Sequence, residues 1–287
     1  MTLGEALPAI GRSDKWETLC DTSAMTLVLI AALAYLIATA LLARALARDA
    51  DSDARGWLPL ALLGVALHAA FHLQAWRAAD GLDMHFFAAL SLVGLGMAAM
   101  TTLVGSFGRM AAVGVVAFPV AAASLAGYAA YGHVHSEGLD WRLQLHAWCA
   151  LLAYATLAIA ALLALMLWAQ ERALRRREFH GWLRALPPLT ELETLLFRTI
   201  AVGFILLTAT LLTGVLFVEN LLAQHLVQKT VLSVLSWLVF GGLLLGRWQR
   251  GWRGATAVRW TLTAMVLLVL AFFGSKFVLE LVLHRPG

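Results

Sequence analysis

Long apolar runs separated by short polar segments dominate the pattern of the chain. A run of about 20 apolar residues is long enough to cross the hydrocarbon core of a bilayer as a helix. Eight runs come close to this length, at residues 25–43, 57–76, 85–105, 110–131, 146–168, 199–218, 230–246 and 257–283. The pattern therefore predicts an all-α, polytopic membrane protein built as a bundle of eight transmembrane helices.

The composition agrees with this class. Hydrophobic residues make up 61% of the chain and charged residues 13%, whereas soluble domains have about 45–50% and about 25%. The mean hydropathy is +0.81. Because the runs use nearly the whole chain, we expect one transmembrane domain over residues 25–287 and no separate soluble domain. Residues 1–24 are expected to be an external extension, either a short helix or a stretch upstream of a true start at Met25.

The basic residues are concentrated in every second loop. The loops after the first, third, fifth and seventh runs, together with Arg259 at the start of the eighth run, contain fourteen of the 21 lysines and arginines. Since loops rich in Lys and Arg remain in the cytoplasm, we expect both termini to lie outside it. The net charge of +4 is thus a topology signal and indicates no nucleic-acid partner. The partner that the pattern does indicate is the lipid bilayer.

With this orientation, eight of the nine histidines lie outside the membrane or in its outer half. His68 is the deepest of them, because a rise of about 1.5 Å per residue places it roughly 16 Å from Trp57 at the inner edge. An ionisable group near mid-membrane is costly and marks a candidate functional site. His72 lies one turn further out on the same helix face.

These histidines are candidate ligands for a metal or a haem. His68 and His72 could share a metal ion, but two ligands from one helix face cannot bind opposite sides of a porphyrin. A haem held by two histidines needs a second span, and His146 at the start of the fifth run is the best partner. Trp141 could flank a porphyrin or belong to an interfacial aromatic belt. The sequence contains no metal-binding motif.

No catalytic motif is present either, since the sequence lacks a nucleophile elbow, a phosphate loop and a zinc-protease motif. We therefore do not expect an enzyme. A transporter that uses His68 and His72 as an intramembrane site is a weak alternative, because no paired intramembrane carboxylate accompanies them.

Several blocks together resemble the cytochrome c assembly family of bacterial inner-membrane proteins, and within it the YpjD-type branch related to HemX and CcsA. They include "LQLHAWCALLAYATLAIAALLALMLWAQERAL", "LPPLTELETLLFR", "QKTVLSVLSWLVFGGLLLGR" and "GWRGATAVRW". Their order and spacing match over roughly residues 25–283. The resemblance implies a haem b cofactor and a place in the cytoplasmic membrane. It matches His146 and His68 to family histidines, and in CcsA relatives such histidines ligate haem that is exported for apocytochrome c.

The segment before the seventh run departs from the haem-handling relatives. They have a tryptophan-rich external stretch there, whereas this chain reads "NLLAQHLVQKTVLSVLSW". Three classes of function remain. The first is a haem-binding or haem-handling protein with His68, His146 and His72 as candidate ligands and Trp141 beside them. The second is a non-haem accessory protein that keeps the fold to interact with other membrane proteins. The third is the transporter.

Overall fold

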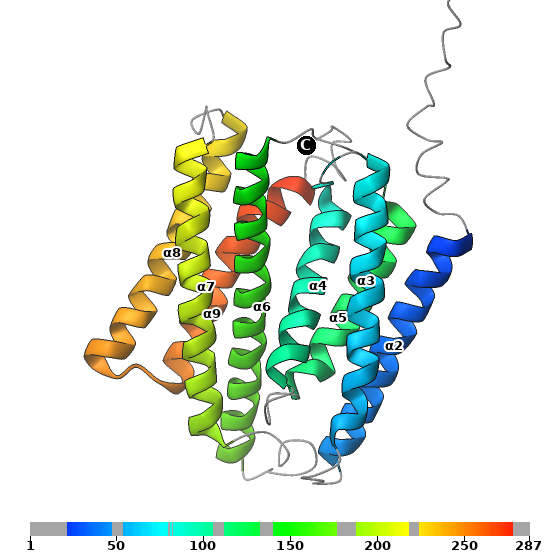
Figure 1. The fold of residues 1–287 in the computed structure, drawn as a ribbon. Helices are drawn as coiled ribbons and strands as arrows, with labels where there is room; N and C mark the ends of the chain where they lie inside the picture. The colour runs from blue at the N-terminus through cyan, green and yellow to red at the C-terminus, as the bar shows by residue number, and fades with distance from the viewer. Residues whose placement is uncertain are drawn as a thin grey trace, which may run out of the picture.

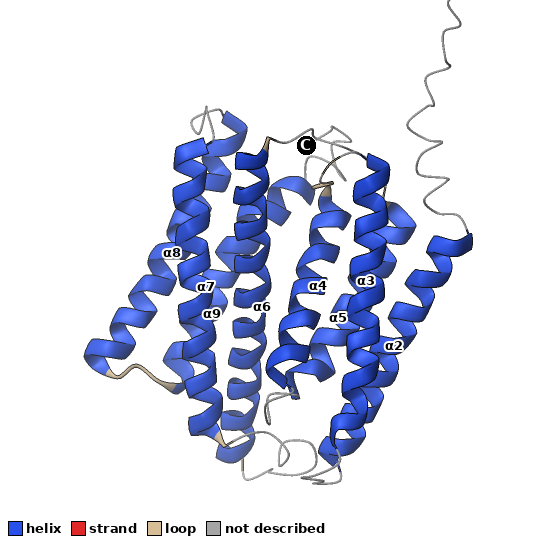
Figure 2. Cartoon of the chain, viewed as in Figure 1, coloured by secondary structure: helices blue, strands red, loops and turns tan. Residues whose placement is uncertain are grey.

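Eight long helices make up the part of the protein that the computed structural model describes, which is residues 22–47, 54–79, 81, 83–105, 112–132, 140–176, 188–217 and 224–277. No strand occurs in these residues (Figures 1 and 2). The helices are α2 (Thr22–Ala47), α3 (Leu58–Ala79), α4 (Phe86–Gly105), α5 (Gly114–Tyr131), α6 (Trp141–Arg175), α7 (Leu189–Phe217), α8 (Gln224–Arg250) and α9 (Gly254–Val269). A 3-10 turn, η1 (Ala54–Trp57), precedes α3, and a π-helical turn, η4 (Leu270–Gly274), follows α9.

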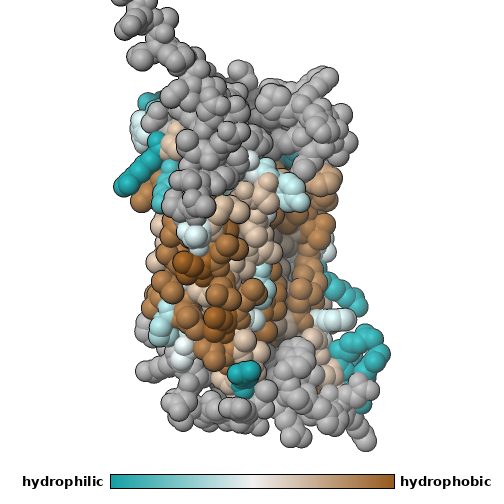
Figure 3. Space-filling model, turned by 90° about the vertical axis from the view of Figure 1, so that its right-hand side faces the viewer, coloured by the Kyte–Doolittle hydropathy of each residue, from teal (hydrophilic) through white to brown (hydrophobic). Residues whose placement is uncertain are grey.

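Eight helical segments, the last of them α9 continued by η4, are long and apolar enough to cross a membrane. The prediction of an all-α bundle with eight spans is confirmed. On the face shown in Figure 3, apolar residues fill the middle of the height and hydrophilic residues gather toward the two ends. The orientation of the termini stays a prediction. Following it, we call the end with Trp76, Phe86 and Trp141 the outer end, which is the upper end in Figure 1.

Several helices extend beyond the apolar runs that predicted them. The fifth run covers residues 146–168, whereas α6 spans Trp141–Arg175. Its start is set by Asp140, whose carboxylate accepts a hydrogen bond of 2.8 Å from the amide of Trp141. Such a cap satisfies an amide that the helix itself leaves unpaired. Residues 1–21 lie outside the described residues, and α2 begins at Thr22.

The bundle is divided into two groups of four helices. In the first group, α2 packs on α3 and α5. The buried residues of this group include Tyr35 and Leu42 of α2 and Phe118 of α5. In the second group, α6 packs along α7 and α9, and α8 lies against α9 and α7. Small residues such as Ala31, Ala38 and Ala121 let the helix backbones approach closely, as is usual in lipid.

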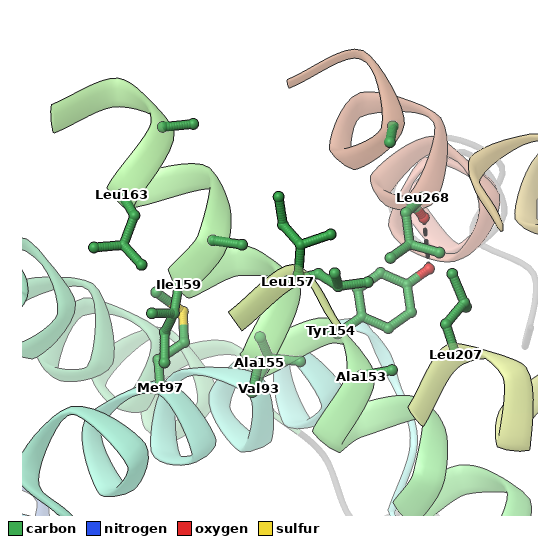
Figure 4. Packing of buried hydrophobic residues seen from close by; sticks show 14 of the residues in the cluster. Val93, Met97, Ala153, Tyr154, Ala155, Leu157, Ile159, Leu163, Leu207 and Leu268 are labelled. Atoms are coloured by element: carbon green, nitrogen blue, oxygen red, sulfur yellow. Dashed lines mark hydrogen bonds between the residues drawn. The ribbon is translucent and has the colours of Figure 1, made fainter. Parts of the chain in front are cut away.

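Helix α4 joins the two groups by packing on α6. Figure 4 shows Val93 and Met97 of α4 below Ala155 and Ile159 of α6. We call this α4–α6 contact the seam. On the other side of α6, the Tyr154 hydroxyl donates a 2.5 Å hydrogen bond to the Leu268 carbonyl of α9, just before η4. The seam therefore sets how the first helix group sits against the second.

Candidate functional site

A bridged pair of histidines lies inside the first helix group. His68 and His72 are one turn apart on α3, and their rings stack with centroids 5.4 Å apart. The Ser91 hydroxyl of α4 lies 2.9 Å from Nε2 of His68 and 3.0 Å from Nε2 of His72. Because a hydroxyl has one proton, Ser91 donates to one imidazole and accepts from the other. A single side chain therefore fixes both rings.

His68 is completely enclosed, with none of its surface exposed. Its Nδ1 lies 3.4 Å from the hydroxyl of Tyr35 on α2, and the two rings meet edge to face. Both ring nitrogens of His68 thus have protein partners. This arrangement suits a residue that holds its neighbours in place more than one that binds a ligand directly.

The polar cluster continues toward the outer end through Tyr128 of α5. The ring of His72 stacks on Tyr128 with centroids 5.1 Å apart. The Tyr128 hydroxyl donates to Oδ2 of Asp83 over 3.4 Å, and the other carboxylate oxygen of Asp83 lies 2.7 Å from Nδ1 of His85. Asp83 and His85 are both buried. His72 therefore lies between the fully buried His68 and a polar cluster formed by Tyr128, Asp83 and His85.

A cavity of about 270 Å³ opens beside His72, between α3, α4, α5 and α6. His72, Asp83 and Tyr128 form its polar wall. The other lining residues are apolar: Ala69, Leu73, Ala75, Trp76, Leu92, Leu95, Gly96, Trp148, Leu151 and Leu152. Four of them are 36–48% exposed, namely Leu73, Trp76, Trp148 and Leu152. The cavity therefore opens sideways, onto the surface that faces lipid.

Two indoles stand at this opening. Trp76 of α3 and Trp148 of α6 have ring centroids 6.0 Å apart and planes inclined by 31°. Indole faces pack favourably on flat aromatic rings. The opening thus has side chains suited to a planar, apolar ligand.

His146 faces a different neighbour. Its Nδ1 lies 3.1 Å from the Thr213 hydroxyl of α7, and a Cβ placed on Gly214 would lie 3.2 Å from its Cε1. Trp148, which lines the cavity, is two residues further along α6. Residues two positions apart in a helix point about 200° apart around its axis, which is nearly opposite. The structure therefore turns His146 toward α7 and does not bring it to the pair formed by His68 and His72.

Trp141, at the start of α6, also contacts α7. Its ring is 6.2 Å from that of Phe217 on α7, the guanidinium of Arg142 lies 5.6 Å from its centroid, and 63% of its surface is exposed. This is the environment of an interfacial aromatic residue. His133 and His135 lie outside the described residues.

Sequence patterns did not identify Ser91, Tyr35 or Tyr128 as parts of the site. A serine or tyrosine in an apolar helix has many roles, and only the folded arrangement shows which ones from α2, α4 and α5 meet the histidines of α3. Asp83 carried a weak signal, as an acidic residue two positions before a histidine at a helix start. Among the described residues, no three His, Cys, Asp or Glu side chains are placed to hold a metal ion.

The fold and this site together define a multi-pass membrane protein with a histidine pair inside the bundle, one member fully buried and the other beside a cavity that is open to lipid. The particular family follows from comparison with known proteins. The family model for the cytochrome c assembly protein matches residues 57–283. The chain belongs to the cytochrome c assembly family, and it is a multi-pass inner-membrane protein.

Individual relatives agree with this membership. The chain is 31% identical to the inner membrane protein YpjD of Escherichia coli K12 over 263 residues, which cover 88% of this chain and 98% of the relative. It is 39% identical to an uncharacterised 28.8 kDa protein of Azospirillum brasilense, over 49% of this chain and 53% of that protein. It is also 31% identical to the cytochrome c biogenesis protein CcsA of Prochlorococcus marinus MIT 9515, over 34% of this chain and 31% of that protein. No solved structure matches significantly.

Proposed function

We propose that this protein binds or handles haem in the membrane, with His72 as the protein ligand at the cavity. The observation that carries the proposal is the position of His72, whose imidazole lines a cavity that opens to lipid. The chain also belongs to a family described by cytochrome c assembly. Haem is flat and largely apolar, so it reaches such an opening from the bilayer without crossing water.

The side chains around His72 fit a haem edge. Imidazole nitrogen is a common axial ligand of haem iron. Trp76 and Trp148 offer indole faces at the opening, and the remaining lining is aliphatic apart from the polar wall. The cavity of about 270 Å³ is slightly below the usual range of small-molecule sites, about 300–1,000 Å³. The fit is therefore to a haem that stays partly exposed to lipid, as suits handling and release.

One hydrogen bond has to be exchanged for Nε2 of His72 to act as a ligand. This nitrogen now faces the Ser91 hydroxyl at 3.0 Å. Ser91 keeps its contact with His68 when it releases His72, so no buried hydroxyl is left unpaired. The net loss is one hydrogen bond, on the order of 1 kcal/mol.

The roles of the residues follow from this arrangement. His72 binds the haem, and His68, which Ser91 fixes, stacks against the His72 ring. The two tryptophans flank the opening. A bound haem would supply the redox chemistry, and the protein would supply ligation, orientation and partial exclusion of water. We propose no catalytic step by the chain itself. The partners in this proposal are lipid, haem and other membrane proteins that receive haem.

This assignment differs from the pairing of His68 with His146 that the sequence suggested. His68 has both nitrogens bonded within the protein, and His146 faces Thr213 on α7. The geometry favours His72 as the residue to test first.

The experiment is an optical spectrum of the purified protein, oxidised and reduced, after haem is supplied. We expect a Soret band that is largely lost in His72→Ala and retained in His146→Ala, which is the matched control. Loss in His146→Ala with retention in His72→Ala would restore the pairing suggested by the sequence. A wild-type preparation that remains colourless would contradict the proposal and favour a non-haem accessory protein.

A further inference from the structure

A second cavity lies at the opposite end of the bundle, where positive-inside topology predicts the cytoplasm. It is a cleft of about 450 Å³ between the end of α6 and the starts of α7 and α9. Its lining residues are mostly polar: Leu167, Glu171, Arg175, Leu189, Thr190, Glu193, Arg253, Gly254, Ala255 and Thr256. In Figure 1 the connection between α8 and α9 lies short of the lower ends of α6 and α7. We call this cleft the ledge, because α6 and α7 extend past the α8–α9 connection beside it.

Glu193 of α7 fixes the floor of this ledge. Its Oε1 accepts a 2.7 Å hydrogen bond from the amide of Gly254, and its Oε2 lies 3.3 Å from Nε of Arg253. Arg247 of α8 approaches the same oxygen at 3.8 Å. Glu193 is buried, so these partners account for its charge. This carboxylate is a structural group that attaches the α8–α9 connection to α7.

The two charged residues of α6 that line the cleft, Glu171 and Arg175, are not used in this way. Glu171 and Arg175 are one turn apart, the spacing at which such residues often form an ion pair. Within the described part of the chain, neither side chain takes part in an ion pair or side-chain hydrogen bond. Both line the cleft. The ledge thus presents one carboxylate and one guanidinium, with Arg253 adding a second positive group beside them.

The surroundings of the cleft are those of a lipid headgroup region. Trp248, at the end of α8, is 82% exposed, and exposed Trp at a helix end marks the membrane interface. The exposed Arg250 follows in the same segment. An amphipathic molecule in the bilayer can therefore place its polar end on the ledge while its chains remain in lipid.

We propose that this cleft binds the headgroup of a zwitterionic phospholipid with a primary ammonium, as in phosphatidylethanolamine. The phosphate pairs with Arg175 and Arg253, because guanidinium groups bind phosphate oxygens through several N–H donors. The ammonium donates to Glu171, which lies against Gly254 at the inner side of the cleft. An anionic lipid without an ammonium leaves Glu171 facing a negative group. A choline headgroup has no N–H to donate.

The test is native mass spectrometry of the detergent-purified full chain, titrated separately with phosphatidylethanolamine, phosphatidylcholine and phosphatidylglycerol. We expect phosphatidylethanolamine to be retained best, and Glu171→Gln and Arg175→Gln each to weaken it roughly fivefold, the scale of an interfacial ion pair. Arg176→Gln and Glu191→Gln are the matched controls, because both residues are exposed and neither lines the cleft. The controls should leave retention unchanged.

Three results would overturn the proposal. The first is equal retention of all three lipids. The second is stronger retention of phosphatidylglycerol that Glu171→Gln does not reduce, which would indicate a site for phosphate alone. The third is a loss in the control variants as large as in the cleft variants. A haem spectrum recorded on the same samples separates this site from the proposed haem site, because the cleft variants should keep their Soret band.

Discussion

Ser91 shows how much of a buried polar site can depend on one small side chain. Its hydroxyl lies within 3.0 Å of Nε2 atoms on two histidines, and none of its own surface is exposed. Buried polar groups are costly when they lose their partners, and far less costly when they are bonded. The pair of histidines is therefore tolerated inside the bundle because Ser91 and Tyr35 satisfy it.

Replacing Ser91 by alanine should destabilise the protein by about 1–3 kcal/mol, because Nε2 of the buried His68 and Nε2 of the partly buried His72 each lose a hydrogen-bond partner. Ser124→Ala is the matched control. Ser124 is also buried, but among the described residues its hydroxyl bonds only to the Ala121 carbonyl of its own helix. We expect thermal unfolding in detergent, followed by circular dichroism, to show a clearly larger loss for Ser91→Ala. Equal losses would mean that the hydrogen bonds of Ser91 to the two histidines add no more to the free energy of unfolding than the bond of Ser124 within its own helix.

Gly251 and Gly254 offer a second test at this scale. Both have positive φ, at 65° and 51°, where a residue with a Cβ is strained by about 1–2 kcal/mol. A Cβ on Gly254 would also meet the carboxylate of Glu171, whereas a Cβ on Gly251 would meet nothing within 4 Å. Because the Glu171 carboxylate is the end of a flexible side chain and can turn aside, we expect Gly254→Ala to lower the unfolding temperature about as much as Gly251→Ala. A clearly larger loss for Gly254→Ala would contradict this and show that Glu171 is held rigidly against α9.

At the scale of helices, the sequence predicted which segments cross the membrane, and it predicted their ends poorly. Apolar length alone identified each span, because a bilayer requires about 20 apolar residues. The ends depend on local groups such as Asp140, which starts α6 before its apolar run. The same limit applies to the site. Spacing along α3 put His68 and His72 on one face, but the side chains that meet that face come from α2, α4 and α5.

His146 illustrates the limit most clearly. Its position at an outer helix start made it a natural partner for His68, since both lie in the outer half of the bundle. Sequence spacing does not fix the rotation of α6 about its axis, and that rotation turns His146 to Thr213 and Trp148 to the cavity. Because successive residues of a helix point about 100° apart, His146 and Trp148 face different neighbours although they are only two positions apart.

The seam between α4 and α6 gives a prediction at this scale. A Cβ on Gly96 would lie 2.8 Å from the Cβ of Ala155, and neither a backbone nor an alanine can move aside easily. Gly96→Ala should therefore push the two helices apart and cost about 1–3 kcal/mol, as overpacking usually does. Gly127→Ala is the control, because its nearest neighbour would be Phe87 at 3.5 Å, an ordinary contact. Thermal unfolding should show a lower unfolding temperature for Gly96→Ala than for Gly127→Ala. An unchanged unfolding temperature in Gly96→Ala would show that α4 and α6 can move apart at little cost.

For the whole molecule, the two groups of four helices leave openings at both ends. The outer cavity beside His72 opens to lipid next to the seam, and the charged cleft lies at the opposite end, on the second group. Both proposed ligands, a haem and a phospholipid headgroup, would arrive through the bilayer. A chain that uses nearly all its described residues for spans has little surface in water from which to recruit ligands.

Each proposal assigns its site to one side of the membrane, so the orientation of the chain has to be tested directly. Basic residues gather in the loops after α2, α4, α6 and α8, which predicts that both termini lie outside the cytoplasm. In a variant whose two native cysteines are serines, we place single cysteines at Gly132 and Arg176, on opposite ends of the bundle. An impermeant maleimide should label Gly132→Cys in cells with a permeabilised outer envelope, and Arg176→Cys only after the inner membrane is opened. The reverse pattern would place the histidine cavity on the cytoplasmic side, where it would face the supply of newly made haem instead of its export.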